Sequence, residues 1–369
     1  MTATLRVMLD QLVAPTETDL EIAARELARG LIAGAPSGCE VEGIAPAGPA
    51  DRPVKIAGLS GVRRTALARR ELAAALQLGM ATGIGAGMIH SPTLLAPLVR
   101  HDRVHDHDQT VVTIWDLGPW EAPGEWPKSV VAWNRAMLKR AVKHADAVVV
   151  PTHSMAGRLG ELARLGERIR VIAGAAPAGF AVPMDEVGRR RALDLPEGFL
   201  LLAGRAAPTD SLAEGLSAVG QAGLDLPVVV IGAGEGEEPA IADLAAAAGI
   251  PERSLHVRGE LPTEDRAAVF GGAVTFVAPA RRTAFPWRVL EALALGVPVI
   301  AASSPVHDEL IHDGGMLVDA EADSLADALE RALGSTASVD RLGVLAADRG
   351  RAFSWREAAD RVWQLHADL

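Results

Sequence analysis

A single carboxylate stands out in an apolar stretch late in the sequence. Glu291 lies in a segment that reads as a strand (274–279), a polar loop, a helix and a second strand. A helix that begins near Phe285, with Pro286 in its first turn and Gly296 at its end, would direct N–H groups out of the carboxyl edge of a sheet. A diphosphate can bind at such a helix start, and a carboxylate further along can accept hydrogen bonds from sugar hydroxyls. The stretch therefore predicts a site for a phosphorylated sugar.

The same stretch resembles the donor-binding half of the retaining GT-B glycosyltransferases of family 4. The resemblance rests on VTFVAP, F, VLEALALGVPVIAAS, ELI and GGMLVD, in that order between Val274 and Asp319. It implies an α/β protein of GT-B fold, with two doubly wound parallel-sheet (Rossmann-like) domains facing a cleft, and it places Glu291 on the nucleotide ribose. The family carries two glutamates eight positions apart here. The first position falls on Thr283 in this chain, so only one acid is retained.

A second group of candidates follows the apolar run 199–203, where Gly204 precedes Arg205. In the resembled family, an arginine here and a lysine about five positions later hold the donor diphosphate. Arg205 is retained, and we expect it to bind the diphosphate and to act as the catalytic cation. The lysine position falls on Asp210. Its charge would repel a phosphate unless the loop is rearranged, and the alternative is that Asp210 only caps the next helix.

The remaining donor-side candidates follow other strands of the second half. Gly232 and Gly234 form a glycine-rich turn, although their spacing is not that of the dinucleotide fingerprint. Arg258 follows the run 255–257, whose loop frames the nucleotide base in the resembled family. Phe285 completes the expected nucleotide-sugar site.

Four tryptophans fall within nineteen residues of the first half, starting where the strand-like run 110–114 ends. The resembled family has His-Asp where this chain has Trp115-Asp116, so a stacking surface replaces an imidazole. We expect Asp116 to serve catalysis, and Trp115, Trp120 and the strand-end residue His90 to bind the acceptor. The alternative is that at least two of the tryptophans pack in the core.

Two stretches of the first half bear on whether the domain could bind a phosphate or a membrane. The segment 13–21 lacks the glycines that the resembled family carries after its first strand. It is acidic, so we expect a capped surface helix that repels phosphate. The segment 62–78 is predicted as one helix, and its arginines are Arg63, Arg64, Arg69 and Arg70. A basic amphipathic helix can lie on an anionic membrane, and the alternative is a solvated basic face.

Histidines and aspartates crowd the segment 101–109. A metal site needs ligands that the surrounding structure holds in place. This segment instead reads as a polar loop between a helix that opens at Pro92 and the next strand. The resemblance implies that no metal and no cofactor is needed, because the nucleotide sugar is a co-substrate.

Strand-like and helix-like runs alternate through both halves of the chain, which predicts two parallel-sheet domains. We expect an N-terminal acceptor-side domain (1–175), a linker (176–197) and a C-terminal nucleotide-sugar-binding domain (198–352). A final helix (353–369) is expected to pack back on the first domain, as in the resembled family.

The composition limits the function further. The chain has 369 residues, a formal net charge of −11 and one cysteine. The acidic balance argues against broad nucleic-acid binding, and a single cysteine excludes a disulfide framework within the chain. The sequence shows neither a basic-then-apolar leader nor an apolar run long enough to span a membrane. We expect a cytoplasmic protein, or one that is peripheral at the inner face of the membrane.

Two functions compete on this evidence. In the first, the chain moves a sugar from a nucleotide sugar to a glycan or lipid-linked acceptor with retention, in cell-envelope polysaccharide or glycoconjugate synthesis. In the second, it is a catalytically inactive paralogue that serves as a non-catalytic subunit of an active glycosyltransferase, because several of the family's cleft positions are substituted. GT-B epimerases and phosphorylases are disfavoured, because neither a cofactor-lysine motif nor a paired acid and base is recognisable.

Overall fold

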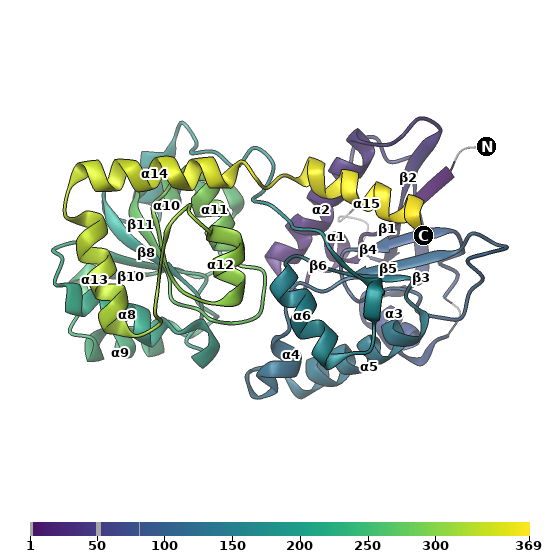
Figure 1. The fold of residues 1–369 in the computed structure, drawn as a ribbon, viewed down its shortest axis with the longest axis horizontal. Coiled ribbons are helices and arrows are strands. Elements are labelled where there is room, and N and C mark those ends of the chain that lie inside the picture. The colour runs from purple at the N-terminus through teal and green to yellow at the C-terminus, as the bar shows by residue number, and fades with distance from the viewer. Residues whose placement is uncertain (1–2, 49–52, 81) are drawn as a thin grey trace. The chain divides into compact units, whose positions relative to one another are not determined.

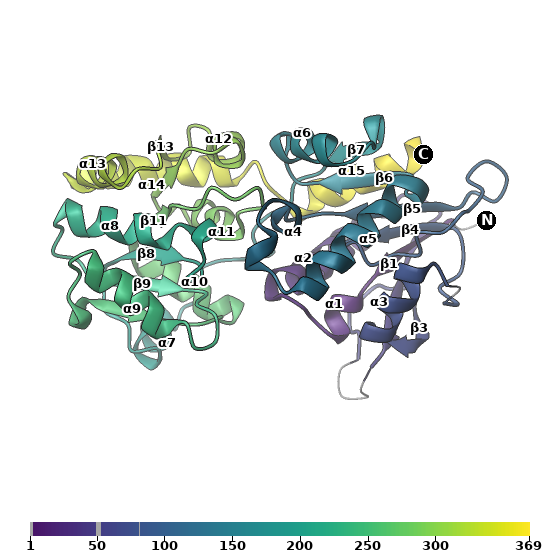
Figure 2. The ribbon, with the colours of Figure 1, turned by 90° about the horizontal axis from the view of Figure 1, so that it is seen from below.

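A computed structural model describes residues 3–48, 53–80 and 82–369. The chain divides into two compact units, the first comprising Met1–Gly174 with Ser354–Leu369 and the second Ala175–Phe353. In each unit a parallel sheet lies between helices (Figure 1, Figure 2). The alternation of strand-like and helix-like runs predicts two α/β domains with parallel sheets, and this prediction is confirmed.

The first unit contains a seven-stranded sheet in the order β3-β2-β1-β4-β5-β6-β7. All neighbouring strands are parallel. The chain builds outward from β1 to one edge and then from β4 to the other, so the order reverses between these two strands. Ligands of doubly wound sheets bind beyond the carboxyl ends of the strands at such a reversal. The strands are β1 (Ala3–Met8), β2 (Cys39–Ala47), β3 (Gly61–Ala68), β4 (Met88–Ser91), β5 (Gln109–Thr113), β6 (Ala147–Val150) and β7 (Ile169–Val171).

The C-terminal helix packs against the first unit. Trp363 Nε1 donates to the carbonyl of Leu31 at 3.0 Å. A Cβ at Gly30 would lie 2.7 Å from the carbonyl oxygen of Trp355, so only glycine permits this close approach. The helices of the unit are α1 (Asp10–Val13), α2 (Thr18–Ala33), α3 (Arg69–Leu78), α4 (Gly118–Glu121), α5 (Lys128–His144), α6 (His153–Leu162) and α15 (Trp355–Asp368).

The second unit contains a six-stranded sheet in the order β10-β9-β8-β11-β12-β13, again with parallel neighbours. Its strands are β8 (Phe199–Ala203), β9 (Val228–Ile231), β10 (Leu255–Val257), β11 (Ala273–Ala278), β12 (Val299–Ala302) and β13 (Met316–Val318). The order reverses between β8 and β11. The loops after these two strands therefore flank the expected ligand-binding crevice of this unit.

Helices α8, α9 and α13 share one aliphatic core with the second sheet, in which Leu202, Leu216, Ile241 and Leu329 are buried together. Such a core fixes the sheet and hence the strand ends that carry the polar residues. The helices of this unit are α7 (Glu186–Ala192), α8 (Leu212–Ala222), α9 (Glu238–Ala247), α10 (Thr263–Gly272), α11 (Trp287–Leu295), α12 (Pro305–Ile311), α13 (Ala322–Leu333) and α14 (Thr336–Gly350).

The predicted helix over 62–78 is wrong in its first half. Residues Gly61–Ala68 form β3, the edge strand that pairs with β2, and the helix begins only at Arg69. An edge strand exposes one side of its backbone and tolerates charged side chains such as Arg63 and Arg64, which explains why the arginines misled the helix prediction.

The helix predicted to open at Pro92 is also absent. Residues 92–100 form bends, and the hydroxyl of Thr93 accepts from the N–H of Leu95, while Ser91 Oγ donates to the carbonyl of Leu95. Such local side-chain bonds compete with helix formation. Pro286 differs from the prediction by one position, because it precedes α11 as its N-cap. The segment predicted as a linker contains α7, and Arg190 of α7 donates to the carbonyl of Ala268 in α10 at 3.1 Å.

Candidate functional site

The loop after β8 carries Arg205 beside a buried carboxylate. Asp210 Oδ2 accepts a hydrogen bond from the backbone N–H of Arg205 at 2.7 Å, and the Arg205 Nε lies 3.9 Å from the same oxygen. Asp210 Oδ1 accepts from Nη1 of Arg282 at 2.9 Å. The N-cap of α8 is Ser211, so Asp210 is not the helix cap considered above. An acid in this loop is thus neutralised by two arginines from neighbouring strand ends.

The glycine-rich turn after β9 binds a side-chain carboxylate of the same chain, that of Glu237. Glu237 Oε2 accepts from the N–H of Gly234 at 2.9 Å and from the N–H of Ala206 at 3.1 Å. Gly232 starts this turn with φ of 77°. The carboxylate joins the loop after β8 to the loop after β9, and it occupies two N–H groups of the kind that bind phosphate oxygens.

Glu291 lies inside the second unit in a network of two arginines. Its Oε1 is 2.8 Å from Arg266 Nη2, and its Oε2 is 2.7 Å from Arg288 Nη1. Arg266 also donates to the carbonyl of Leu261 at 2.8 Å. The helix carries this carboxylate where the sequence predicts it, but both its oxygens are engaged by guanidinium groups. The ribose assignment stays a prediction, and a ribose would have to share or replace the bond from the partly exposed Arg288.

Arg258 and Phe285 have structural partners in the second unit. The Arg258 guanidinium donates to the carbonyls of Leu193 at 2.7 Å and Asp194 at 3.1 Å, just beyond α7. Phe285 is buried and meets the Trp287 ring edge-on, with centroids 4.6 Å apart. Both residues thus help to fix the loops around the strand ends.

The tryptophan predicted as an acceptor platform packs in the first unit. Trp115 is buried, its Nε1 donates to the carbonyl of Pro92 at 2.8 Å, and its ring meets Trp355 of α15 at a centroid distance of 6.3 Å. Because little of the ring is exposed, Trp115 can offer only a small face to a sugar, and the core-packing alternative describes it better. Trp120 is half-buried on α4.

Asp116 follows β5 at the carboxyl edge of the first sheet. Its Oδ1 accepts from the N–H of Gly118 at 2.6 Å, which bends the chain into α4. The side chain is half-buried, so one face remains accessible. The structure thus places Asp116 in the first unit and Arg205 in the second.

His90, at the end of β4, is buried against the C-terminal helix. Its Nδ1 lies 3.4 Å from Nε2 of His366, whose Nδ1 contacts Gln109 Oε1 at 2.8 Å. Burial holds the pKa of His90 well below its usual value, and lowers the pKa of His366 to about 4. Both rings are therefore neutral at pH 7. The structure gives His90 a contact with α15 that the sequence did not predict.

At the strand reversal of the first sheet, a buried acid precedes the glycine-free segment 13–21. Asp10 follows β1 and is fully buried, with Oδ2 2.8 Å from Arg69 Nε and 3.0 Å from Gln11 Nε2. Burial raises the pKa of Asp10, and Arg69 opposes this shift. The Arg69 guanidinium is thus engaged by a carboxylate, and the expectation that the segment 13–21 repels phosphate stays a prediction.

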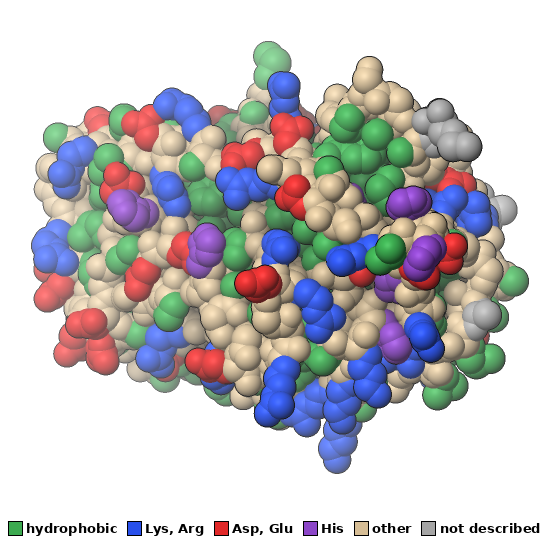
Figure 3. Space-filling model, turned by 45° about the vertical axis from the view of Figure 1, so that its right-hand side comes forward, with side chains coloured by type: hydrophobic (Ala, Val, Ile, Leu, Met, Phe, Trp, Pro, Cys, Tyr) green, Lys and Arg blue, Asp and Glu red, His purple; other side chains and the backbone are tan. Residues whose placement is uncertain are grey.

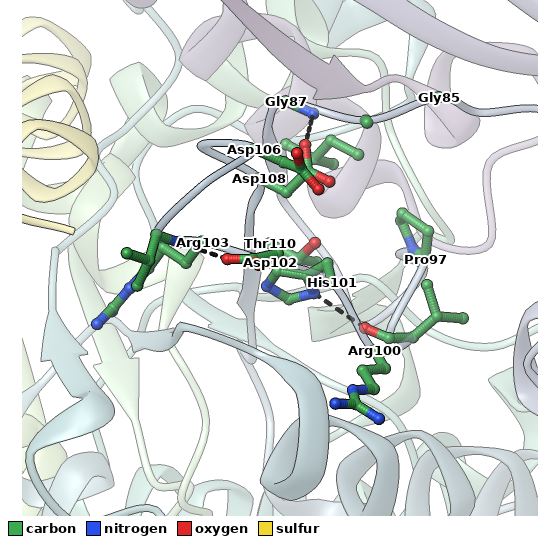
Figure 4. A pocket seen from close by; sticks show the side chains of 14 residues that line it. Gly85, Gly87, Pro97, Arg100, His101, Asp102, Arg103, Asp106, Asp108 and Thr110 are labelled. Atoms are coloured by element: carbon green, nitrogen blue, oxygen red, sulfur yellow. Dashed lines mark hydrogen bonds between the residues drawn. The ribbon is translucent and has the colours of Figure 1, made fainter.

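A hollow of about 750 Å³ in the first unit lies at the opposite edge of its sheet (Figure 4). Its lining includes Gly87 and Asp108, which precede β4 and β5, and His101, whose Nε2 is 2.8 Å from Asp146 Oδ2. Asp108 Oδ1 accepts from the N–H of Gly87 at 2.5 Å. Because doubly wound sheets bind ligands beyond the carboxyl ends of their strands, this hollow is not the expected site. Within the described residues no group of three or more His, Cys, Asp or Glu side chains is arranged to hold a metal ion.

Three residues of the site were missed in the sequence. Arg282 lies next to the substituted position 283, Glu237 lies in an acidic run, and Arg266 lies in a helix that carried no motif. Only Glu237 gave a usable signal, because an acid close to a glycine-rich turn can accept its N–H groups.

Models of two glycosyltransferase domains match the chain. The one described as "Glycosyltransferase Family 4" matches residues 20–175, and the one described as "Glycosyl transferases group 1" matches residues 199–335. Together they extend over both units.

Curated relatives point the same way. The D-inositol 3-phosphate glycosyltransferase of Nocardioides sp. is 31% identical over 250 residues, which is 62% of this chain and 55% of that protein. The enzyme of the same name from Jonesia denitrificans is 32% identical over 64% of this chain and 60% of that protein. The O-antigen chain mannosyltransferase B of Escherichia coli is 23% identical over 74% of this chain and 72% of its own length. The chain spans little more than half the length of the first of these relatives, 55%.

Solved structures share the fold. Sucrose-phosphate synthase from Thermosynechococcus elongatus superposes with a TM-score of 0.73 at 19% identity, covering 99% of this chain and 98% of that one. HepE from Anabaena, solved in complex with UDP-glucose, gives a TM-score of 0.73 at 14% identity, covering 99% and 100%. Both parallel sheets and both domain matches agree with these neighbours, and the chain belongs to the family 4 glycosyltransferases of GT-B fold.

Proposed function

We propose that this protein is a retaining glycosyltransferase that uses a nucleotide-sugar donor and a glycan or lipid-linked acceptor. The proposed process is synthesis of a cell-envelope polysaccharide or glycoconjugate. Family membership supports the transferase class, and the relatives named for D-inositol 3-phosphate and for O-antigen chains supply candidate acceptors.

The observation that carries this proposal is the pair of arginines at the strand reversal of the second sheet. Arg205 follows β8 and Arg282 follows β11, and these strands are neighbours. Their guanidinium groups converge on Asp210, and the two side chains are 38% and 31% exposed. Two partly exposed cations at this edge suit a diphosphate, which takes forked hydrogen bonds from guanidinium groups.

The proposed chemistry asks the protein to position reactants and to neutralise charge. The acceptor oxygen forms a bond to the anomeric carbon as the bond from that carbon to the donor phosphate oxygen breaks. The acceptor proton passes to the leaving phosphate oxygen when both lie on the same face of the sugar, which retains the configuration. Arg205 would stabilise the charge that develops on the diphosphate, so no nucleophilic side chain is required.

A second candidate, the catalytically inactive subunit, is favoured by one specific arrangement. Glu237 and Asp210 already accept the N–H groups of Gly234, Ala206 and Arg205. A donor phosphate would have to compete with these carboxylates for the same strand ends. If these carboxylates remain bound to the backbone N–H groups, the chain would bind no nucleotide.

Calorimetric titration with UDP-, GDP- and dTDP-linked sugars separates the two candidates. The transferase proposal expects one donor to bind, and expects Arg205→Gln to weaken that binding about tenfold, because a hydrogen bond to a charged group is lost. Arg253→Gln, at an exposed arginine of the same unit, serves as the control and should leave the affinity unchanged. Absence of binding for all three donors would favour the inactive subunit.

We also propose that α5 gives the protein peripheral contact with an anionic membrane. The helix contains no acidic residue, and its exposed Lys128, Arg135, Lys139 and Lys143 recur at helical spacing on one face. Figure 3 shows Lys and Arg side chains gathered along the lower edge of the molecule, where Figure 1 labels α5. No helix within the described part of the chain is both long and apolar enough to cross a bilayer.

Vesicle sedimentation tests this contact. Binding should be stronger to phosphatidylglycerol than to phosphatidylcholine vesicles, should weaken as salt rises, and should be reduced in Lys139→Glu. Equal binding to both lipids, or none, would contradict it.

A further inference from the structure

Asp210 and Arg282 form an ion pair across two loops of the second unit. The carboxylate is buried, and its distance to Arg282 Nη1 is 2.9 Å. The resembled family has a lysine at the position of Asp210 and a glutamate at the position of Thr283. In this chain the first loop carries the acid, and the second loop carries a cation, Arg282, next to Thr283. The site has therefore not lost a cation. It carries one on the other loop.

The fold brings this pair together because β8 and β11 are parallel neighbours whose carboxyl ends meet. Asp210 ends a short turn of 3-10 helix (Pro208–Asp210) after β8. Gly204 makes room for it, because φ there is 146° and an added Cβ would lie 3.1 Å from the Asp210 Cβ. The acid is thus held in a fixed place, and it aims at the loop after β11.

Guanidinium groups from two strand ends lie within 4 Å of the Asp210 carboxylate. One carboxylate faces two guanidinium groups, since Arg205 Nε lies 3.9 Å from the same side chain. A guanidinium has five N–H donors and can therefore bind more than one anion at once. The Arg282 side chain is 31% exposed, so an anion at the same strand ends can reach it.

We propose that Arg282 is the second cation of the donor-phosphate site and that Asp210 is the positioning residue that holds it there. This inference rests on the proposed function. Arg282 comes from a loop with no regular structure, so an unanchored side chain would lose several rotatable bonds on binding a diphosphate. Asp210 restricts that freedom beforehand, and such pre-organisation increases affinity.

A positioning role for Asp210 and simple charge repulsion predict opposite effects of Asp210→Asn on phosphate affinity. If Asp210 only repelled phosphate, Asp210→Asn would strengthen binding. If Asp210 positions Arg282, the same change weakens binding although it removes a negative charge. Asn keeps an oxygen that can accept the N–H of Arg205, so the loop itself retains its main hydrogen bond.

The experiment uses the full chain and calorimetric titration with UDP, GDP, dTDP and inorganic diphosphate. For the nucleoside diphosphate that wild type binds best, Arg282→Gln should raise Kd about tenfold, and Asp210→Asn should raise it about threefold. Arg281→Gln, at the exposed neighbour of Arg282, is the matched control and should change Kd less than twofold. Melting temperatures identify any variant that is not folded.

A Kd for Arg282→Gln that equals that of Arg281→Gln, or tighter binding by Asp210→Asn, overturns the inference while the proposed function stands. A wild type that binds no nucleoside diphosphate overturns the proposed function, and the inference with it. Should Asp210→Asn unfold, the Arg282 and Arg281 variants still decide the role of the cation.

Discussion

Arg266 and Glu291 form a salt bridge that is almost fully withdrawn from solvent. Nη2 of the arginine lies 2.8 Å from Oε1 of the glutamate, and each side chain is 2% exposed. Arg288 adds a second cation at 2.7 Å. A buried pair of this kind is costly to break, because the remaining partner is left charged and unpaired in a poorly solvated place.

Glu291→Gln is therefore expected to lower stability. The free energy of unfolding should fall by about 3 kcal/mol, since Arg266 keeps its charge and loses its partner. Urea denaturation of the variant and of Glu214→Gln, an exposed glutamate on α8, provides the comparison. Equal stabilities for the two variants would contradict the structural role.

The same folded variant tests the ribose assignment. If Glu291 also binds the ribose, the Kd for the nucleoside diphosphate rises about tenfold at a temperature where the variant is folded. An unchanged Kd together with reduced stability would remove Glu291 from the donor site and leave it a purely structural residue.

Trp115 and Trp355 should be energetically coupled. Their rings meet edge-on between the loop after β5 and α15, at a centroid distance of 6.3 Å. A double-mutant cycle with Trp115→Phe and Trp355→Phe is expected to give a coupling energy of about 0.5–1.5 kcal/mol in thermal or urea unfolding. Additive effects on stability, combined with weaker acceptor binding by Trp115→Phe, would restore Trp115 as an acceptor platform.

Stability should fall as the pH drops from about 6.5 to about 4. Burial lowers the pKa of His366 from its usual 6.5 to about 4. In this window the unfolded chain binds a proton that the folded chain does not, so the free energy of unfolding decreases with falling pH. The lowered pKa of His90 acts in the same direction. The pKa of His101, raised by its bond to Asp146, acts in the opposite direction.

Melting temperatures measured between pH 4 and pH 7.5 check this prediction. His366→Gln should flatten the decrease relative to wild type. His107→Asn, at an exposed loop histidine, should leave the profile unchanged. A His366→Gln profile with the wild-type slope would show that another group dominates.

Glu237→Gln should strengthen nucleotide binding. The amide oxygen can still accept from the N–H groups of Gly234 and Ala206, while the negative charge near the expected phosphate is removed. We expect Kd to fall about threefold at low salt, and the gain to shrink as salt rises. Glu235→Gln, an exposed neighbour, is the control. Weaker binding by Glu237→Gln would mean that its charge serves the ligand or the loop.

The two parallel-sheet domains could be predicted from the sequence because apolar runs and helical spacing repeat through both halves. The strands before Arg205 and Gly232 are short apolar runs, so the sequence predicts where they end. The strand before Asp116 is also buried, although it combines two valines with Gln and Thr residues. The errors at 62–78 and at Pro92 have different physical causes. One depends on pairing of β3 with a strand remote in sequence, and the other on side-chain bonds to the backbone.

The site was less predictable because its partners are remote in sequence. Arg282 reaches Asp210 across 72 residues, and Arg266 reaches Glu291 across 25. The spacing of residues along the chain does not predict such pairs. A substitution such as Asp210 therefore looked like a lost attraction, whereas the folded chain surrounds it with two arginines.

Transfer from a bound nucleotide sugar is the most direct measurement. The donor that binds best should be incubated with D-inositol 3-phosphate and, separately, with lipid-linked glycan acceptors, and the products read by mass spectrometry and NMR. We expect a product in which the sugar keeps the donor's anomeric configuration, and a strong loss of that product with Arg205→Gln. A donor that binds but yields no product with any acceptor, or a product of inverted configuration, would contradict it.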